Sequence, residues 1–136
     1  MRFGIFFAPV AFLFAAAPMA QPTDGEPFRI FFDWGKPELT RDAQAILGEA
    51  LADYQGSPGS RVEIAGHSDR SGPAAHNIGA SRRRVDAARD WLVERGIPAS
   101  AIAVAAFGES RPIVPTEDGV REAQNRRVEI RILPRN

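Results

Sequence analysis

Cysteine is absent from this chain of 136 residues, and lysine occurs only once, as Lys36. Without cysteine the chain can form no disulfide, no thiolate metal site and no cysteine nucleophile. Neither sign of charge is in excess, because 16 Arg and one Lys balance 17 acidic residues. A balanced charge gives no electrostatic reason to expect nucleic acid or an anionic membrane surface as a partner. The length suits one domain with a hydrophobic core.

The longest apolar run lies at the N-terminus. Residues 4–17 are apolar, follow a single charge at Arg2 and precede small residues up to Ala20. The run is shorter than the roughly 20 residues that a membrane-spanning helix needs. We therefore interpret residues 1–20 as a secretory signal peptide that is cleaved, and residues 21–27 as a short lead. An uncleaved membrane anchor is the competing interpretation.

The remaining domain, residues 28–136, alternates strand and helix patterns. Apolar runs or period-two alternation predict four strands, at 28–32, 62–66, 102–106 and 127–133. Apolar residues at helical spacing predict two helices, at about 40–55 with Thr40 as N-cap and about 74–95 ended by Gly96. The first strand is apolar almost throughout, as expected of a strand paired on both edges. The order βαβαβ–β indicates an α/β two-layer sandwich with right-handed crossovers.

The periodicity also assigns buried faces. In the second helix, the residues expected to pack on the sheet are Ile78, Ser81, Val85, Ala88 and Leu92. In the last strand, the inward residues are Val128, Ile130 and Ile132, and the outward ones are Arg127, Glu129 and Arg131. The segment 109–124 is expected to be a long polar loop with room for one helical turn.

Three polar residues after the second strand point to a ligand site. Asp69 lies in the loop that feeds the second helix, and Asn77 and Arg84 are two turns apart on one face of that helix. A carboxylate, an amide and a guanidinium beside a helix N-terminus suit a small zwitterion, with its ammonium on Asp69 and its carboxylate on Arg84. The competing interpretations are an Asx turn at Asp69, a solvated charge at Arg84 and helix capping by Asn77.

The same residues carry a resemblance to a known family. Three motifs resemble those of OmpA-like peptidoglycan-binding domains: G-H-S-D-x-x-G at 66–72, A-S-R-R-R-V at 80–85 and N-R-R-V-E-I at 125–130. Further matches keep the same register, namely F-D-W-G-K-P-E-L-T at 32–40, R-G-I-P at 95–98 and F-G-E-S-R-P at 107–112. The resemblance implies a mixed four-stranded sheet ordered 1-4-2-3, with the last strand antiparallel and the helices on one face. It also implies that Asp69 and Arg84, which have the family's spacing of fifteen residues, hold the diaminopimelate of the peptidoglycan stem peptide.

Five further residues are candidates for the pocket wall: Asp33, His76, Asn125, Arg126 and Arg127, with Trp34 beside the first. For Asp33 and Trp34 the competing interpretation is simply the end of the first strand, and for His76 it is packing at the pocket edge. For the two arginines it is an internal ion pair with Asp33 or Glu129.

Three nearby residues are expected to have structural roles. We expect His67 to donate to the backbone, and Ser68 and Ser71 to serve in the turn. The two histidines, His67 and His76, show no metal-ligand spacing, so we expect neither a metal nor a cofactor.

We therefore expect a secreted periplasmic domain, with association to the outer membrane left open, that binds peptidoglycan non-covalently and catalyses nothing. The alternative hypothesis is an interaction or docking subunit of an envelope complex, such as a motor stator or secretion machine. Its partners would then include outer-membrane or other envelope proteins. A cell-wall enzyme is a third hypothesis, but the sequence shows no nucleophile–base pair that would support it.

Overall fold

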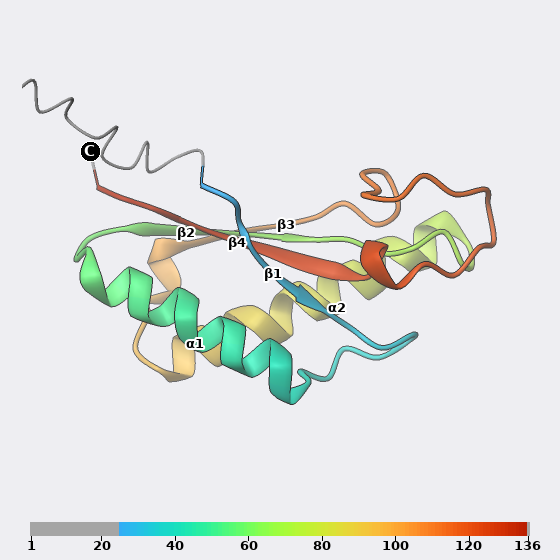
Figure 1. Cartoon of the computed structure of the whole chain (residues 1–136). Helices are drawn as coiled ribbons and strands as arrows, with labels where there is room; N and C mark the ends of the chain where they lie inside the picture. Colours follow the sequence, from blue (N-terminus) through green and yellow to red (C-terminus); the bar gives the residue numbers. More distant parts are fainter. Residues whose placement is uncertain (1–24, 136) are drawn as a thin grey trace, which may run out of the picture.

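The computed structural model describes residues 25–135, so the predicted signal peptide and most of the predicted lead lie outside the described residues. Two helices cover one face of a single sheet, as Figure 1 shows, which confirms the two-layer α/β sandwich. The main elements are β1 (Phe28–Phe31), α1 (Arg41–Gly56), β2 (Arg61–Gly66), α2 (Ala74–Glu94), β3 (Ile102–Ala106) and β4 (Arg127–Leu133). Short 3-10 turns precede the last two strands, η1 (Ala99–Ala101) and η2 (Ala123–Asn125). Within the described residues, no helix combines the length and the apolar character that crossing a membrane requires.

The strands are ordered β1-β4-β2-β3, as the family resemblance implied. β2 and β3 are parallel, whereas β4 runs antiparallel to both of its neighbours, β1 and β2. The expectation that β1 is paired on both edges is wrong, because β1 lies at the sheet edge and pairs only with β4. Its apolar character has another cause, since Ile30 and the following Phe32 pack into the core, whereas Phe31 lies on the other face and is 44% exposed.

Local hydrogen bonds define one end of each helix, as the sequence predicts. The Thr40 hydroxyl accepts a hydrogen bond from the Ala43 N–H at 3.0 Å and caps α1. After α2, Gly96 adopts a positive φ of 106°. The N–H groups of Gly96 and Ile97 return to the carbonyls of Val93 and Leu92, which is a Schellman ending. These contacts fix the start of α1 and the end of α2.

The core lies between the sheet and the two helices. Its fully buried members include Ile30, Leu47, Val62, Ile64, Val85, Leu92, Val128 and Ile130. The close approach of α2 to β2 is fixed at Gly66, where an added Cβ would lie 2.4 Å from the Ser81 carbonyl oxygen. α2 thus crosses the last residue of β2 at Ser81, and the part of α2 before Ser81 extends past the strand end (Figure 1).

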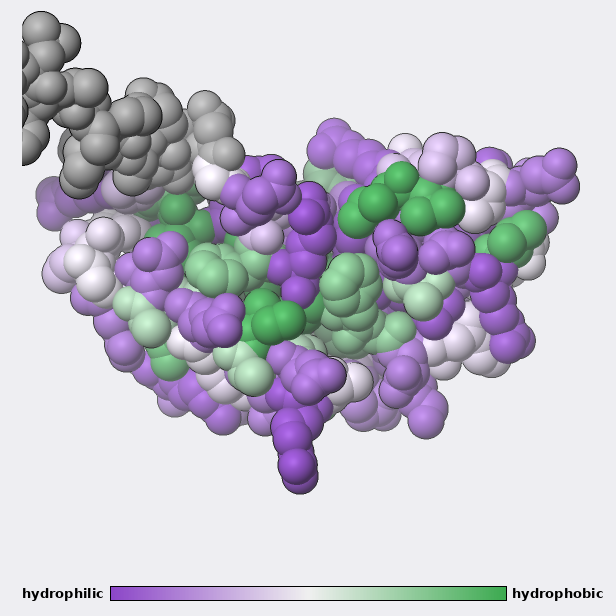
Figure 2. Space-filling model, viewed as in Figure 1, coloured by the Kyte–Doolittle hydropathy of each residue, from purple (hydrophilic) through white to green (hydrophobic). Residues whose placement is uncertain are grey.

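Ile78 is therefore not a core residue, and its prediction as one is wrong. It lies one helical turn before Ser81, where no strand remains beneath the helix, and it is 53% exposed. The other exposed large hydrophobic residues are Phe31, Trp34, Ile113 and Val120. On the face that Figure 2 shows, hydrophobic residues reach the surface in separate patches among hydrophilic ones.

Arg127 lies on the outward face of the sheet, as predicted, but it is buried there. Its side chain lies on the sheet face without helices, yet the residue is only 4% exposed. The chain leaving β3 folds over this face, and the Arg111 carbonyl accepts a hydrogen bond from Arg127 Nη2 at 3.0 Å. Arg127 Nε lies 3.5 Å from Glu129 Oε2, which is one of the ion pairs that the sequence left open.

Candidate functional site

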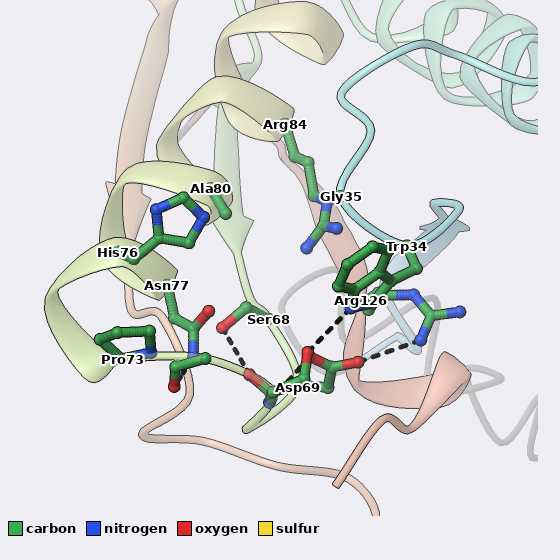
Figure 3. Close-up of a pocket in the computed structure, with 12 residues that line it drawn as sticks. Trp34, Gly35, Ser68, Asp69, Pro73, His76, Asn77, Ala80, Arg84 and Arg126 are labelled. Atoms are coloured by element: carbon green, nitrogen blue, oxygen red, sulfur yellow. Dashed lines mark hydrogen bonds and ion pairs between the residues drawn. The ribbon is translucent and has the colours of Figure 1, made fainter. Parts of the chain in front are cut away.

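A cavity of about 390 Å³ lies between the start of α2, the loop after β2 and the loop after β1 (Figure 3). The three predicted ligand residues Asp69, Asn77 and Arg84 all line it, together with His76 and Arg126 from the wider set of candidates. The remaining lining residues are Trp34, Gly35, Ser68, Ser71, Gly72, Pro73 and Ala80. The fold thus brings the predicted site together in one place.

Asp69 is buried, with 3% of its surface exposed, and both carboxylate oxygens accept hydrogen bonds. Oδ1 accepts from the Ser71 backbone N–H at 3.2 Å and from the Ser71 hydroxyl. Oδ2 accepts from the Glu122 N–H at 3.1 Å and from Arg126 Nη1 at 3.0 Å. The bond to the Ser71 N–H is the Asx-turn contact, so the structural interpretation of Asp69 holds alongside its place in the cavity.

Arg84 is held by three backbone carbonyls. Its Nε, Nη1 and Nη2 atoms donate to the carbonyls of Lys36 at 3.4 Å, His67 at 3.3 Å and Asp33 at 3.5 Å. Among residues 25–135, no further acceptor meets the second N–H on either Nη1 or Nη2. Each terminal nitrogen thus keeps one N–H for a ligand, and a carboxylate is the group that accepts paired bonds from a guanidinium.

The charges of the cavity persist at neutral pH. Burial alone would raise the pKa of Asp69, but hydrogen bonds from Ser71, Arg126 and Glu122 outweigh it and hold the pKa below its usual value. Burial, followed by the charge of Arg126, lowers the pKa of Arg84 to about 10, against the opposing effect of Asp69. The Asp69 carboxylate and the Arg84 guanidinium are therefore both ionised in the cavity.

Trp34 forms the wall opposite α2. Its indole N–H donates to the Ser71 hydroxyl at 3.0 Å, and the Arg121 guanidinium stacks on its ring, 3.6 Å from the centroid. Asp33 contributes its backbone carbonyl to Arg84, but its side chain does not line the cavity, which corrects its prediction as a wall residue.

Asn125 and Arg127 also lie outside the cavity, contrary to expectation. Asn125 is fully buried, and its side-chain oxygen accepts hydrogen bonds from the N–H groups of Ile113 at 2.8 Å and Val114 at 2.9 Å. Its amide nitrogen donates to the Val114 carbonyl at 2.8 Å. Asn125 therefore holds the loop between β3 and β4 in place through these hydrogen bonds and does not face the cavity.

The predicted donation from the His67 side chain to the backbone is not seen in the described part of the chain, where Nδ1 is buried without a partner. The ring stacks on Phe107 at a centroid distance of 5.5 Å. Burial, reinforced by the nearby charge of Arg127, lowers the pKa of His67 to about 4, so the ring is neutral at pH 7.

Asn77 shows both of the features that the sequence left open. Its side-chain amide lines the cavity and donates to the Gly72 carbonyl at 3.3 Å, just before the start of α2. Ser68 and Ser71 were predicted only as turn residues, yet both also line the cavity. The position of Ser71, two residues after an aspartate in a turn, is the one sequence signal that could have placed it beside Asp69.

Comparisons with known proteins agree with this architecture. An outer membrane protein of Gluconacetobacter diazotrophicus is 38% identical over 115 residues, covering 80% of this chain and 30% of the relative. A peptidoglycan-associated lipoprotein of Rhizobium meliloti is 36% identical over 102 residues, covering 73% of this chain and 56% of the relative. This chain thus spans less than a third of the length of the first relative and little more than half of the second.

A solved structure shares the fold. The peptidoglycan-associated lipoprotein from Burkholderia pseudomallei superimposes with a TM-score of 0.70 at 23% identity, covering 76% of this chain and 88% of that one. The model of the OmpA family matches residues 31–126, a stretch that begins in β1 and contains every residue lining the cavity. The chain belongs to the OmpA family.

Proposed function

We propose that this domain binds peptidoglycan non-covalently by holding the diaminopimelate of the stem peptide, and that it is not an enzyme. The observation that carries the proposal is the placement of Asp69 and Arg84, both ionised, on one cavity of about 390 Å³. The similarity to a protein named as a peptidoglycan-associated lipoprotein supports the choice of polymer. Such binding would tether the protein to the cell wall within the envelope.

The ligand's two charged groups have separate partners in this proposal. The ammonium of diaminopimelate meets Asp69, and the neighbouring carboxylate meets the free N–H groups of Arg84. The first turn of α2 begins at Ala74 beside the cavity, so its unpaired N–H groups and the helix dipole also favour the carboxylate. The apolar wall at Trp34 and Pro73 suits the methylene chain between the ligand's two ends.

The expected affinity for a single site is modest. Hydrogen bonds to charged groups contribute about 1.5–3 kcal/mol each. A few such bonds, less the cost of immobilising the ligand, correspond to micromolar to millimolar dissociation constants. A polymeric wall offers many neighbouring sites, so weak single contacts can still retain the protein there.

The test is co-sedimentation of the purified protein with two kinds of sacculi at fixed salt. Lysine-type walls keep the terminal amine but lack the second carboxylate, so losing one charge-assisted bond predicts roughly 10- to 150-fold weaker binding. Arg84→Ala should remove most of this discrimination, and Arg84→Lys should restore only part of it because an ammonium cannot form the bidentate fork. Asp69→Ala should weaken binding to both walls.

Arg82→Ala is the matched control, since Arg82 lies two residues from Arg84 on the exposed side of α2 and pairs with Asp86 instead. Equal binding of the wild type to both walls would refute the diaminopimelate assignment. Binding that survives both Asp69→Ala and Arg84→Ala would place the site elsewhere on the domain. Loss of sacculus turbidity on incubation with the protein would contradict the non-catalytic proposal.

A further inference from the structure

The carboxylate of Asp69 has no free acceptor position for a ligand's ammonium. A carboxylate offers about four lone-pair sites. Asp69 already accepts four hydrogen bonds, two at Oδ1 from Ser71 and two at Oδ2 from the Glu122 N–H and Arg126 Nη1. A ligand that pairs with Asp69 must therefore replace one of these donors.

Arg126 is the donor that can be exchanged. Two of the other bonds come from backbone N–H groups, so breaking them would require the loop itself to move. The third comes from the Ser71 hydroxyl, which the Trp34 indole N–H holds in place by donating to it at 3.0 Å. Arg126 instead reaches Asp69 with the end of a long side chain, which is 13% exposed and lines the cavity (Figure 3). Its Nε donates to the Phe32 carbonyl at 3.0 Å, which holds the guanidinium near the cavity even when Nη1 is displaced.

The same contact sets the charge that a ligand meets. Arg84 and Arg126 contribute two positive charges against the single negative charge of Asp69, and all three line the cavity. With Asp69 already neutralised by Arg126, the unliganded cavity favours an anionic group over an ammonium. A ligand that carries both groups can still bind, but its ammonium gains an ion pair only as another is lost.

We propose that Arg126 is an internal counter-ion, that the ammonium of a bound zwitterion must displace it from Asp69, and that Arg126 thereby sets the preference of the cavity between ammonium and carboxylate groups. This inference rests on the proposed diaminopimelate site. As a consequence, Arg126 reduces the binding affinity that the ligand's amine contributes. A ligand with carboxylates alone does not need Asp69 and leaves Arg126 in place.

Titration calorimetry with meso-diaminopimelate and with pimelate tests this, since the two compounds share a seven-carbon dicarboxylate chain and differ only in the amines. In Arg126→Gln the charged competitor is gone, so the preference for diaminopimelate over pimelate should rise about tenfold, equivalent to about 1.4 kcal/mol. Arg126→Lys also loses the bond to the Phe32 carbonyl but keeps a cation opposite Asp69, so its preference should stay within about threefold of wild type.

Arg82→Gln is the matched control, because it removes an arginine–aspartate contact of 3.1 Å on the exposed side of α2. It should leave the preference unchanged, and thermal melting verifies that each variant is folded. A preference that stays the same or falls in Arg126→Gln, while wild type binds diaminopimelate through Asp69, would overturn this inference alone. If wild type and every variant bind neither compound, the proposed function and the inference both fail.

Discussion

The position of α2 over the sheet depends on the absence of a side chain at Gly66. A Cβ at this position would lie 2.4 Å from both the Ser81 carbonyl oxygen and Val85 Cγ2, whereas ordinary contact begins at 3.4 Å. Gly66→Ala must therefore push α2 and β2 apart by about 1 Å, the difference between these two distances. Overpacking a core costs about 1–3 kcal/mol. We expect the upper end of that range, because backbone atoms must move.

Gly48→Ala is the matched control, since it makes the same chemical change inside α1. An added Cβ at Gly48 meets no heavy atom within 4 Å. Alanine is favoured over glycine in a helix interior by about 0.5–1 kcal/mol. The two variants should thus change the free energy of unfolding in opposite directions, as measured in urea melts. For Gly66→Ala the loss corresponds to a fall in Tm of roughly 12–24 °C.

The same displacement should reach the candidate site. Arg84 directly precedes Val85 on α2, so moving the helix also moves the guanidinium away from Asp69 on the loop after β2. We expect weaker binding to diaminopimelate-type sacculi for Gly66→Ala and unchanged binding for Gly48→Ala. If the free energy of unfolding of Gly66→Ala lies within about 0.5 kcal/mol of the wild-type value, the contact between α2 and β2 is looser than the structure indicates and the reasoning is wrong.

Three further predictions concern stability. Leu47→Ala empties a fully buried core position and should cost about 2–5 kcal/mol in denaturant melts, whereas Arg82→Ala on the exposed face should stay within about 0.5 kcal/mol; equal losses would refute the assignment of buried faces. Asn125→Ala removes three hydrogen bonds to residues 113–114 and should cost at least about 2 kcal/mol and speed proteolysis of that loop; a loop as resistant as wild type would contradict its role. Folding lowers the pKa of His67 from 6.5 to about 4, so between pH 6.5 and pH 4 the unfolded state binds more protons than the folded state. The free energy of unfolding should therefore fall by about 1–3 kcal/mol as the pH decreases from 6.5 to about 4. His67→Phe keeps an aromatic ring beside Phe107 and should flatten that part of the pH profile; an unchanged profile would show that His67 is not its source.

The sequence by itself determined the elements and their ends. Helix and strand periods are properties of neighbouring residues, and so are end signals such as the Thr40 hydroxyl and the left-handed Gly96. The family motifs added the strand order, including the edge position of β1 that its apolar composition alone had argued against. The grouping of Asp69 and Arg84 was also predictable, because only one turn and the first half of α2 separate them.

Tertiary structure decided which side chains meet across long stretches of chain. The length of α2 relative to β2 leaves Ile78 exposed, although the helical period is the same there as at buried Val85. Folding of the loop after β3 buries Arg127 on a face that alternation assigns to solvent. Asn125 likewise finds its partners eleven and twelve residues away, in a loop whose path no local pattern specifies.

The ion pair between Arg126 and Asp69 shows the same division at the candidate site. These residues are 57 positions apart, and they meet because β4 lies antiparallel beside β2, so that the start of one strand adjoins the end of the other. The sequence named both residues as candidates but gave no reason to pair them, and it offered Asp33 or Glu129 as partners instead. Local hydrogen bonds and side-chain periods act within a few residues, whereas burial and charge pairing depend on sheet register, which exists only once the chain has folded.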